Sequence, residues 1–136
     1  MTILVRNDLG ELERVGRTIA EFWAERGLPV EMEGDVNLAL EEVLANVILH
    51  GYQDRSEHNI AVSLEANGGE VRVAIEDDGM PFNPLEAPEA DLSGSLENRP
   101  IGGLGIHLVR SLMDHLEYAR SGDRNQLIMT KRVTEA

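Results

Sequence analysis

The sequence predicts a single domain of the α/β class, and three observations lead to this prediction. Segments whose apolar residues recur with the period of a helix are interspersed with segments that alternate residue by residue, as strands do. The chain has 136 residues, enough for one domain with a substantial core and too few for two. Hydrophobic residues make up 42% and charged residues 27%, the balance of an ordinary globular protein.

The first half of the chain is predicted to form one strand and two helices. Residues 2–6 are the strand candidate. Residues 8–27 are a helix that Asp8 would cap, with Glu11 three residues later and Gly27 as its stop. The second helix spans residues 35–50, from a cap at Asp35 to Gly51. Each helix has one apolar stripe, formed by Leu12, Val15, Ile19, Phe22 and Trp23 in the first and by Val36, Leu40, Val43, Leu44 and Val47 in the second.

The second half is predicted to begin with a hairpin. Residues 59–79 alternate apolar and polar positions on both sides of an Asn-Gly-Gly turn. Residues 80–101 hold four prolines and no periodicity, and loops of this length are often lids or binding loops. A glycine-led helix over 102–116 and a last strand over 125–133 complete the prediction.

Composition excludes several classes of function. The formal net charge is −13, from 25 acidic and 12 basic residues, and no cluster of Lys and Arg is present, so we expect neither a nucleic-acid nor a membrane partner. The chain has no cysteine, which rules out disulfides and thiolate chemistry. The amino terminus turns polar after four apolar residues, and no apolar run approaches the roughly 20 residues of a membrane span. We therefore expect a cytoplasmic protein.

A row of polar residues lies along one edge of the second helix. Glu42, Asn46 and His50 stand four residues apart and share that edge. One interpretation is a solvated helix edge, with the imidazole favoured by the helix C-terminus. The other is that the row faces a cavity, where a carboxylate can act as a general base and an amide oxygen can bind Mg²⁺. The row alone does not decide between them.

Asp77 continues an apolar row at the end of the predicted hairpin. Val71, Val73, Ile75 and Asp77 share one strand face by parity. A carboxylate on a core-facing row is costly unless it is hydrogen-bonded, and the amino group of a ligand could supply that bond. Alternatively, Asp-Asp-Gly is simply the turn that ends the strand. Gly79 permits either a sharp turn or a close backbone approach.

A glycine pattern opens the helix that follows the long loop. Gly102, Gly103 and Gly105 would leave free amides at a helix start, which favours an anion. The pattern is not a Walker A loop, because no Gly-Lys-Ser/Thr follows, and a dinucleotide fingerprint would need a preceding strand. A phosphate site of another type remains possible.

Taken in order, these stretches resemble the GHKL ATPase superfamily, and within it the stand-alone anti-sigma factor serine protein kinases. The motifs are Glu-x-x-x-Asn on a helix followed by "HGY", then "DDGMPFNP", then "GGLGIHLVRSLMD". The resemblance covers nearly the whole chain. It implies the Bergerat ATP-binding fold: a two-layer α+β sandwich, with a mixed, mainly antiparallel sheet covered on one face by about three helices. Residues 1–136 would form a single such domain, with an ATP lid around residues 83–101.

The resemblance also implies roles for the matching residues. Glu42 would be the catalytic base, Asn46 would hold Mg²⁺, and Asp77 would accept a hydrogen bond from the adenine amino group. Gly79 would let the backbone approach the base, and Phe82 would also be an ATP-binding residue. Arg99 of the lid could reach the γ-phosphate, an assignment made from its charge and position alone. The amides that would cradle the phosphates are those of Gly102, Gly103, Leu104, Gly105 and Ile106.

Two departures bear on these assignments. Pro81 stands where many members of the superfamily have a second glycine, and we expect this proline to stiffen the start of the lid. Glu41 directly precedes Glu42 and competes for the role of base. It lies about 100° away around the helix, so its spacing to Asn46 favours Glu42.

By this resemblance the chain is an ATP- and Mg²⁺-dependent serine/threonine protein kinase. Its substrate would be a STAS-type anti-anti-sigma protein, its second partner a sigma factor, and it could form a homodimer. The main alternative is a nucleotide-binding regulatory module that phosphorylates nothing. A target outside sigma-factor control and a purely structural role are further alternatives.

Overall fold

The computed structural model describes residues 1–54, 56–81, 83 and 103–133; the side chains of residues 103–106 are outside this description. Its elements are β1 (Thr2–Arg6), α1 (Glu11–Glu25), the short 3₁₀ helix η1 (Val30–Met32), α2 (Glu33–His50), β2 (Asn59–Asn67), β3 (Glu70–Asp77), α3 (Gly103–Leu112), β4 (His115–Ser121) and β5 (Arg124–Arg132).

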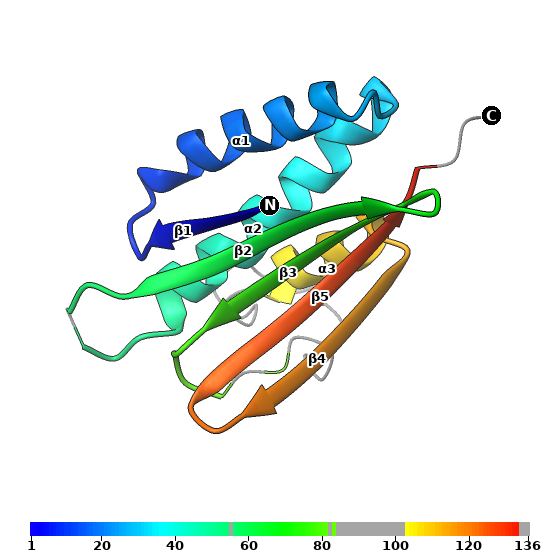
Figure 1. Cartoon of the computed structure of the whole chain (residues 1–136). Helices are drawn as coiled ribbons and strands as arrows, with labels where there is room; N and C mark the ends of the chain where they lie inside the picture. The colour runs from blue at the N-terminus through cyan, green and yellow to red at the C-terminus, as the bar shows by residue number, and fades with distance from the viewer. Residues whose placement is uncertain (55, 82, 84–102, 134–136) are drawn as a thin grey trace.

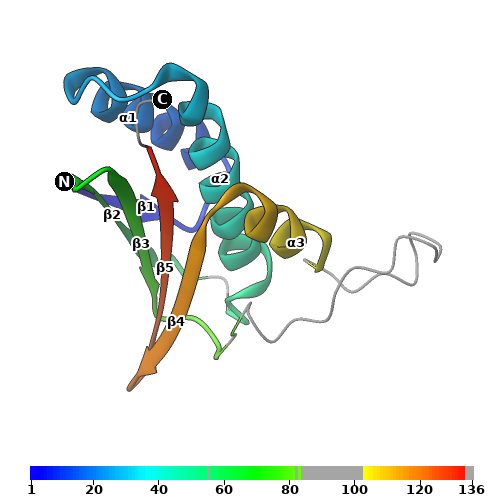
Figure 2. The same cartoon turned by 90° about the vertical axis from the view of Figure 1, so that its right-hand side faces the viewer.

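The strands form one five-stranded sheet in the order β1-β2-β3-β5-β4. All four strand pairs are antiparallel. The helices lie on one side of the sheet, with α2 and α3 side by side and α1 toward one end (Figures 1 and 2). This confirms the predicted two-layer fold, with the sheet antiparallel throughout its described pairings. None of the helices in the described part of the chain is long and apolar enough to cross a membrane.

The core lies between the sheet and the helices. Both predicted stripes contribute to it: Val15, Ile19, Phe22 and Trp23 of α1, and Val36, Leu40, Val43 and Leu44 of α2, are buried. The sheet contributes alternate residues, as the period-two pattern requires. These are Ile60, Val62 and Leu64 of β2, Val71, Val73 and Ile75 of β3, and Leu127 and Met129 of β5.

The hairpin forms as predicted, and its turn explains why. Gly68 and Gly69 have φ angles of 60° and 79°, a region that favours glycine, so the Asn-Gly-Gly sequence suits the connection. The resulting register pairs Val62 with Ile75. Asp77 is the last residue of β3 and continues its core-facing row, so the interpretation that places Asp77 outside the strand is wrong.

The predicted helix caps are wrong. Helix α1 begins at Glu11, and the Asp8 carboxylate instead accepts a hydrogen bond from the Gly10 amide (2.9 Å) in the turn before the helix. Helix α2 begins at Glu33, two residues before the predicted cap, because the 3₁₀ turn η1 leads directly into it. Asp35 then lies in the first turn and pairs with Lys131 (3.5 Å).

The predicted helix over 102–116 is too long. Helix α3 ends at Leu112, and His115–Ser121 form an edge strand, β4, which the sequence analysis did not predict. Two contacts from β5 set this boundary: Lys131 donates to the Leu112 carbonyl (2.7 Å), and Thr130 accepts from the Asp114 amide (2.9 Å). The helix therefore stops where the next segment meets the sheet edge.

Candidate nucleotide-binding site

The polar residues along the edge of α2 differ in their exposure to solvent. Glu42 and Asn46 are half-buried, whereas His50, at the end of the helix, is exposed. No hydrogen bond or ion pair joins Glu42 to another described residue. The side-chain nitrogen of Asn46 is buried and also lacks a partner in the described part of the chain. Both side chains are therefore free to meet a ligand.

Helix α2 ends against the turn that follows β3. The Met80 amide donates to the Gly51 carbonyl at 2.8 Å. A Cβ atom placed on Gly79 would lie 2.5 Å from that same carbonyl oxygen, closer than real Cβ atoms come. Gly79 is thus required by a close approach of two backbones. With a rise of about 1.5 Å per residue, Asn46 lies about 7.5 Å along the helix from this junction.

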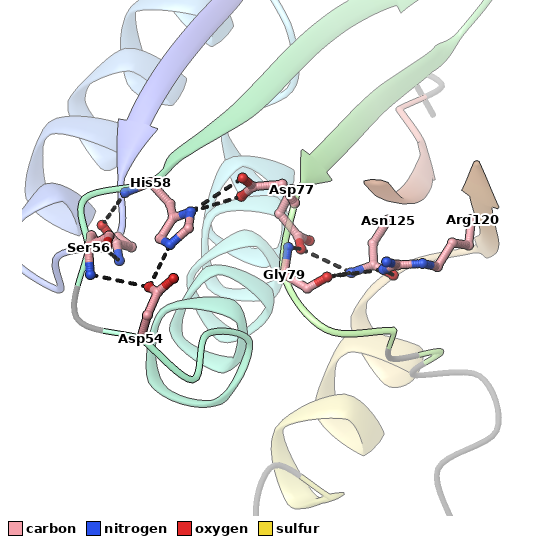
Figure 3. Close-up of polar contacts among 9 residues, drawn as sticks. Asp54, Ser56, His58, Asp77, Gly79, Arg120 and Asn125 are labelled. Carbon is pink, nitrogen blue, oxygen red and sulfur yellow. Dashed lines mark hydrogen bonds and ion pairs between the residues drawn. The ribbon is translucent and has the colours of Figure 1, made fainter. Parts of the chain in front are cut away.

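Asp77 is buried at this junction, with 5% of its surface exposed. Its Oδ1 atom accepts two hydrogen bonds, from the Gly79 amide (2.8 Å) and from Asn125 Nδ2 (3.0 Å; Figure 3). No described residue donates to its other oxygen, Oδ2. The protein itself therefore offsets the cost of burying this carboxylate, and one oxygen is left for a donor from outside.

The side-chain partner of Asp77 lies on β5 and is itself held by residues of β4, none of which was predicted from the sequence. Asn125 is buried and stands opposite Asp77 in the sheet register. Tyr118 and Arg120 both donate to Asn125 Oδ1, and Arg120 also donates to the Gly79 carbonyl (3.0 Å). The signal was an amide in the apolar row Asn125, Leu127, Met129, which parity assigns to the same face as Asp77.

A second polar cluster lies on the opposite side of the turn (Figure 3). His58 places Nε2 2.7 Å from Asp54 and Nδ1 3.2 Å from Asp78, and its ring stacks on Tyr52 with the centroids 4.1 Å apart. The hydrogen bond to Asp54 is the largest factor raising the pKa of His58, and the same bond lowers the pKa of Asp54. These residues border an open cavity of about 440 Å³ beside Gly79.

Tyr52 joins this cluster to the Asp77 side. Its hydroxyl is buried and lacks a hydrogen bond of normal geometry to the described residues. Burial raises the pKa of Tyr52 above its usual range, and the charges of Asp77 and Asp78 raise it further. The hydroxyl therefore stays neutral beside these carboxylates.

The remaining candidate residues lie at the edge of what the structure describes. Phe82, Arg99 and Gly102 lie outside the described residues, as does the predicted lid over 83–101 except Asn83. Gly103, Leu104, Gly105 and Ile106 are described in backbone only, and they form the first turn of α3, as predicted. That turn belongs to the helix that packs beside α2, so the glycine segment and the Glu42–Asn46 edge are on neighbouring elements.

Comparison with known proteins identifies the family of this fold. Residues 5–131 match the model of the histidine kinase-like ATPase domain. The chain belongs to this family. An ATPase domain implies ATP as the nucleotide of the site, which agrees with a glycine-rich helix start, an unpartnered polar edge on α2 and a buried carboxylate acceptor at the end of β3.

Relatives of this histidine kinase-like ATPase domain include proteins named as sigma-factor regulators and kinases. The chain is 27% identical over 115 residues to an anti-sigma F factor of Clostridium beijerinckii, covering 84% of this chain and 80% of that protein. It is 30% identical over 95 residues to the serine/threonine-protein kinase BtrW of Bordetella bronchiseptica, covering 70% and 67% of the two chains.

A solved structure supports the fold. The RsbU and RsbW domains of Rv1364c from Mycobacterium tuberculosis superpose on 98% of this chain with a TM-score of 0.70 and 20% identity. The chain spans 31% of that longer protein. This structure supports the fold alone; the family match and the sequence relatives named as anti-sigma F factors confirm the resemblance to the anti-sigma branch of the GHKL superfamily.

Proposed function

We propose that this protein is an ATP- and Mg²⁺-dependent serine/threonine protein kinase of the anti-sigma type. Its substrate is a serine on a STAS-type anti-anti-sigma protein, and its second partner is a sigma factor that it holds inactive. The observation that carries the proposal is the pairing of a half-buried, unpartnered Glu42 with Asn46 on the edge of α2. A regulatory module that only bound nucleotide would not need a free carboxylate beside the phosphate site.

The transfer step has a definite balance of bonds. Glu42 takes the proton of the serine hydroxyl, and the serine oxygen forms a bond to the γ-phosphorus. The bond between the γ-phosphorus and the β,γ-bridging oxygen breaks, and ADP carries that electron pair away. Catalysis of this kind depends mainly on positioning and on neutralising charge. The backbone amides at the start of α3 and the fixed turn after β3 supply the positioning.

Asn46 fits the role of a magnesium ligand. Neither end of its side-chain amide bonds to a described residue, so the oxygen is available to a hard cation and the nitrogen to a phosphate oxygen. The described residues do not bring three His, Asp or Glu side chains together around a possible metal position. This suits Mg²⁺, which binds through few protein groups and keeps phosphate and water ligands. When bound, the ion offsets the negative charge of the phosphates.

Partner exchange follows from charge. The protein has a net charge of −13, and a phosphoserine adds about −1.5 to −2 charges to the substrate protein. Phosphorylation therefore weakens docking of the anti-anti-sigma protein on this acidic surface. The kinase is then available to bind the sigma factor. The proposal places the protein in the cytoplasm, where both partners act, and a homodimer is compatible with it.

The test is phosphotransfer with matched carboxylate variants. The protein is incubated with γ-labelled ATP, Mg²⁺ and a lysate of the source cells, and labelled proteins are separated and analysed for phosphoserine. We expect one small labelled protein, and a rate about 10² to 10⁴ times lower for Glu42→Gln. Glu41→Gln is the control, because it makes the same change one residue away on the same helix.

Three outcomes separate the alternatives. A label that depends on Glu42 but not on Glu41 supports the kinase and yields its substrate for identification. A label that depends on Glu41 moves the role of base to that residue. No label, with ATP binding intact by calorimetry, contradicts the kinase and favours the non-catalytic module.

A further inference from the structure

The side chain of Asn125 is held in one orientation from both ends. Its Oδ1 accepts from the Tyr118 hydroxyl and from Arg120 Nη1 (3.1 Å), and its Nδ2 donates to Asp77 Oδ1 (3.0 Å) and to the Met80 carbonyl (2.8 Å). Rotating the amide by half a turn would point its oxygen at two acceptors and its nitrogen at the Arg120 guanidinium, which can only donate. The residue is 6% exposed, so water could not compensate for those mismatches.

The fixed orientation of the Asn125 amide determines which oxygen of Asp77 is left for a ligand. Asp77 Oδ1 receives two donors, from Gly79 and Asn125, and both need a lone pair there. The whole carboxyl group is thereby held in place with Oδ2 as its unpartnered oxygen. An oxygen that accepts suits a ligand edge that donates, such as the exocyclic amino group of adenine, and disfavours a base with an oxo group at that position.

We propose that Asn125, oriented by Tyr118 and Arg120, is a positioning residue that sets the preference of the site for 6-aminopurines over 6-oxopurines. This inference rests on the proposed ATP site and goes beyond it, because it assigns base selectivity to the β4–β5 hairpin. The contacts of this hairpin at Asp77, Gly79 and Met80 all lie at the end of β3.

The experiment compares the affinities of the full chain for ATP and ITP, in Mg²⁺, by calorimetry. ITP carries an oxo group where ATP carries the amino group. In Asn125→Asp a carboxylate of nearly the same shape faces Asp77, so Asp77 Oδ1 loses a donor and the two like charges repel each other. The Asp77 carboxyl group is then no longer held with Oδ2 toward the ligand. We expect wild type to prefer ATP by at least tenfold and Asn125→Asp to lower that ratio by roughly tenfold.

Gln126→Glu is the matched control. It makes the same amide-to-acid change on the next residue of β5, where the side chain is exposed and lies on the other face of the sheet. We expect its ATP/ITP ratio to stay within about twofold of wild type. A general loss of structure would weaken the binding of both nucleotides to the same extent and leave the ATP/ITP affinity ratio unchanged. A change in this ratio therefore reports the positioning of Asp77 and not the stability of the fold.

A second variant covers the case in which Asn125→Asp does not fold. Tyr118→Phe keeps the ring and removes the hydroxyl that orients Asn125, and we expect the ratio to fall by about threefold. An unchanged ratio in a folded Asn125→Asp, or in Tyr118→Phe if that variant alone folds, overturns the inference and leaves the ATP site intact. Equal affinity of wild type for the two nucleotides also overturns it. Failure of wild type to bind ATP at all overturns the proposed function itself.

Discussion

The amide of Met80 donates a hydrogen bond to the carbonyl of Gly51 across 2.8 Å, and this bond joins the turn after β3 to the end of α2. The two elements carry different parts of the candidate site: Asn46 lies on the helix and Asp77 on the strand. Because the contact is between backbones, it sets their separation independently of side-chain rotamers. Four predictions follow from the way in which the surrounding residues use this junction.

Gly79→Ala should damage the junction. A Cβ atom there would lie 2.5 Å from the Gly51 oxygen and 3.0 Å from Asp77 Oδ1, so the turn must shift. We expect the free energy of unfolding to fall by about 1–3 kcal/mol, as overpacking does, and ATP affinity to fall with it. Urea denaturation and calorimetry measure the two effects. The control is Gly34→Ala in α2, which meets nothing within 4 Å and should raise stability by about 0.5–1 kcal/mol. Similar behaviour of both variants contradicts the prediction.

Asp77→Asn should weaken ATP binding while the fold survives. Gly79 and Asn125 both donate at Oδ1, so the new amide turns its oxygen toward them and its nitrogen takes the position of Oδ2. A donor then faces the donor of the ligand, which costs about 1–3 kcal/mol, or roughly tenfold to a hundredfold in affinity by calorimetry. Asp78→Asn is the control, because that side chain points to His58 instead. Equal losses in the two variants would show that charge alone is responsible.

Asn46→Leu should remove the magnesium dependence of nucleotide binding. We expect the ATP affinity of wild type to fall by tenfold or more when EDTA replaces Mg²⁺, and that of the variant to be weak in both conditions. Asn37→Leu is a matched control on the same helix: its buried Oδ1 also lacks a partner in the described structure, but it faces Gly16 on α1 rather than the site. If Asn46→Leu keeps the full response to Mg²⁺, the proposed ligand is wrong.

The His58 cluster should make stability depend on pH. The pKa of His58 is raised above 6.5 by Asp54, and Asp78 adds to this; Tyr52, stacked on the ring, stays neutral. A raised pKa means that the folded state holds the proton more tightly, so the stabilisation is complete below pH 6.5 and is lost as pH rises through the raised pKa. The pKa of Asp54 is lowered from 3.8. The stabilisation that its carboxylate contributes is therefore present above pH 3.8 and is lost as the pH falls below it.

Unfolding free energies of wild type and His58→Gln from pH 5 to pH 9 measure this effect. The stability advantage of wild type should be largest near pH 6 and should shrink toward pH 9. His50→Gln is the control, because that imidazole is exposed at the end of α2 and has no partner in the part of the chain described here. A constant difference between wild type and His58→Gln across the range would mean that His58 acts only through packing.

The sequence predicted the elements whose pattern is local and missed those that depend on distant partners. The stripe of α2 and the β2–β3 hairpin follow from periods of 3.6 and 2, which the backbone imposes on every residue. The edge strand β4 carries the same alternation at Leu116 and Tyr118, both half-buried, but over a short stretch that also continues a helical pattern. Pairing with β5 decided between the two.

The residues of the candidate site also fall into those that a local pattern predicted and those that depend on distant partners. Parity placed Asp77 on the core face, and spacing placed Glu42 and Asn46 on one helix edge. The sequence predicted a ligand donor for Asp77, whereas Asn125, which lies 48 residues further along the chain, donates to one of its oxygens. The ATP-binding assignments to Phe82, Arg99 and Gly102 stay predictions, since those residues lie outside the described structure.

The sequence by itself determined the fold class, the faces of the helices and strands, and the polar residues that interrupt those faces. These properties follow from backbone periodicity and from the cost of burying a charge, and both act within a few residues. Only the tertiary structure decided that Asn125 bonds to Asp77 and is itself oriented by Tyr118 and Arg120, and that Gly51 and Met80 join α2 to β3. The register between β3 and β5 and the contact between helix and turn bring together residues far apart in the chain, and no local pattern encodes such distances.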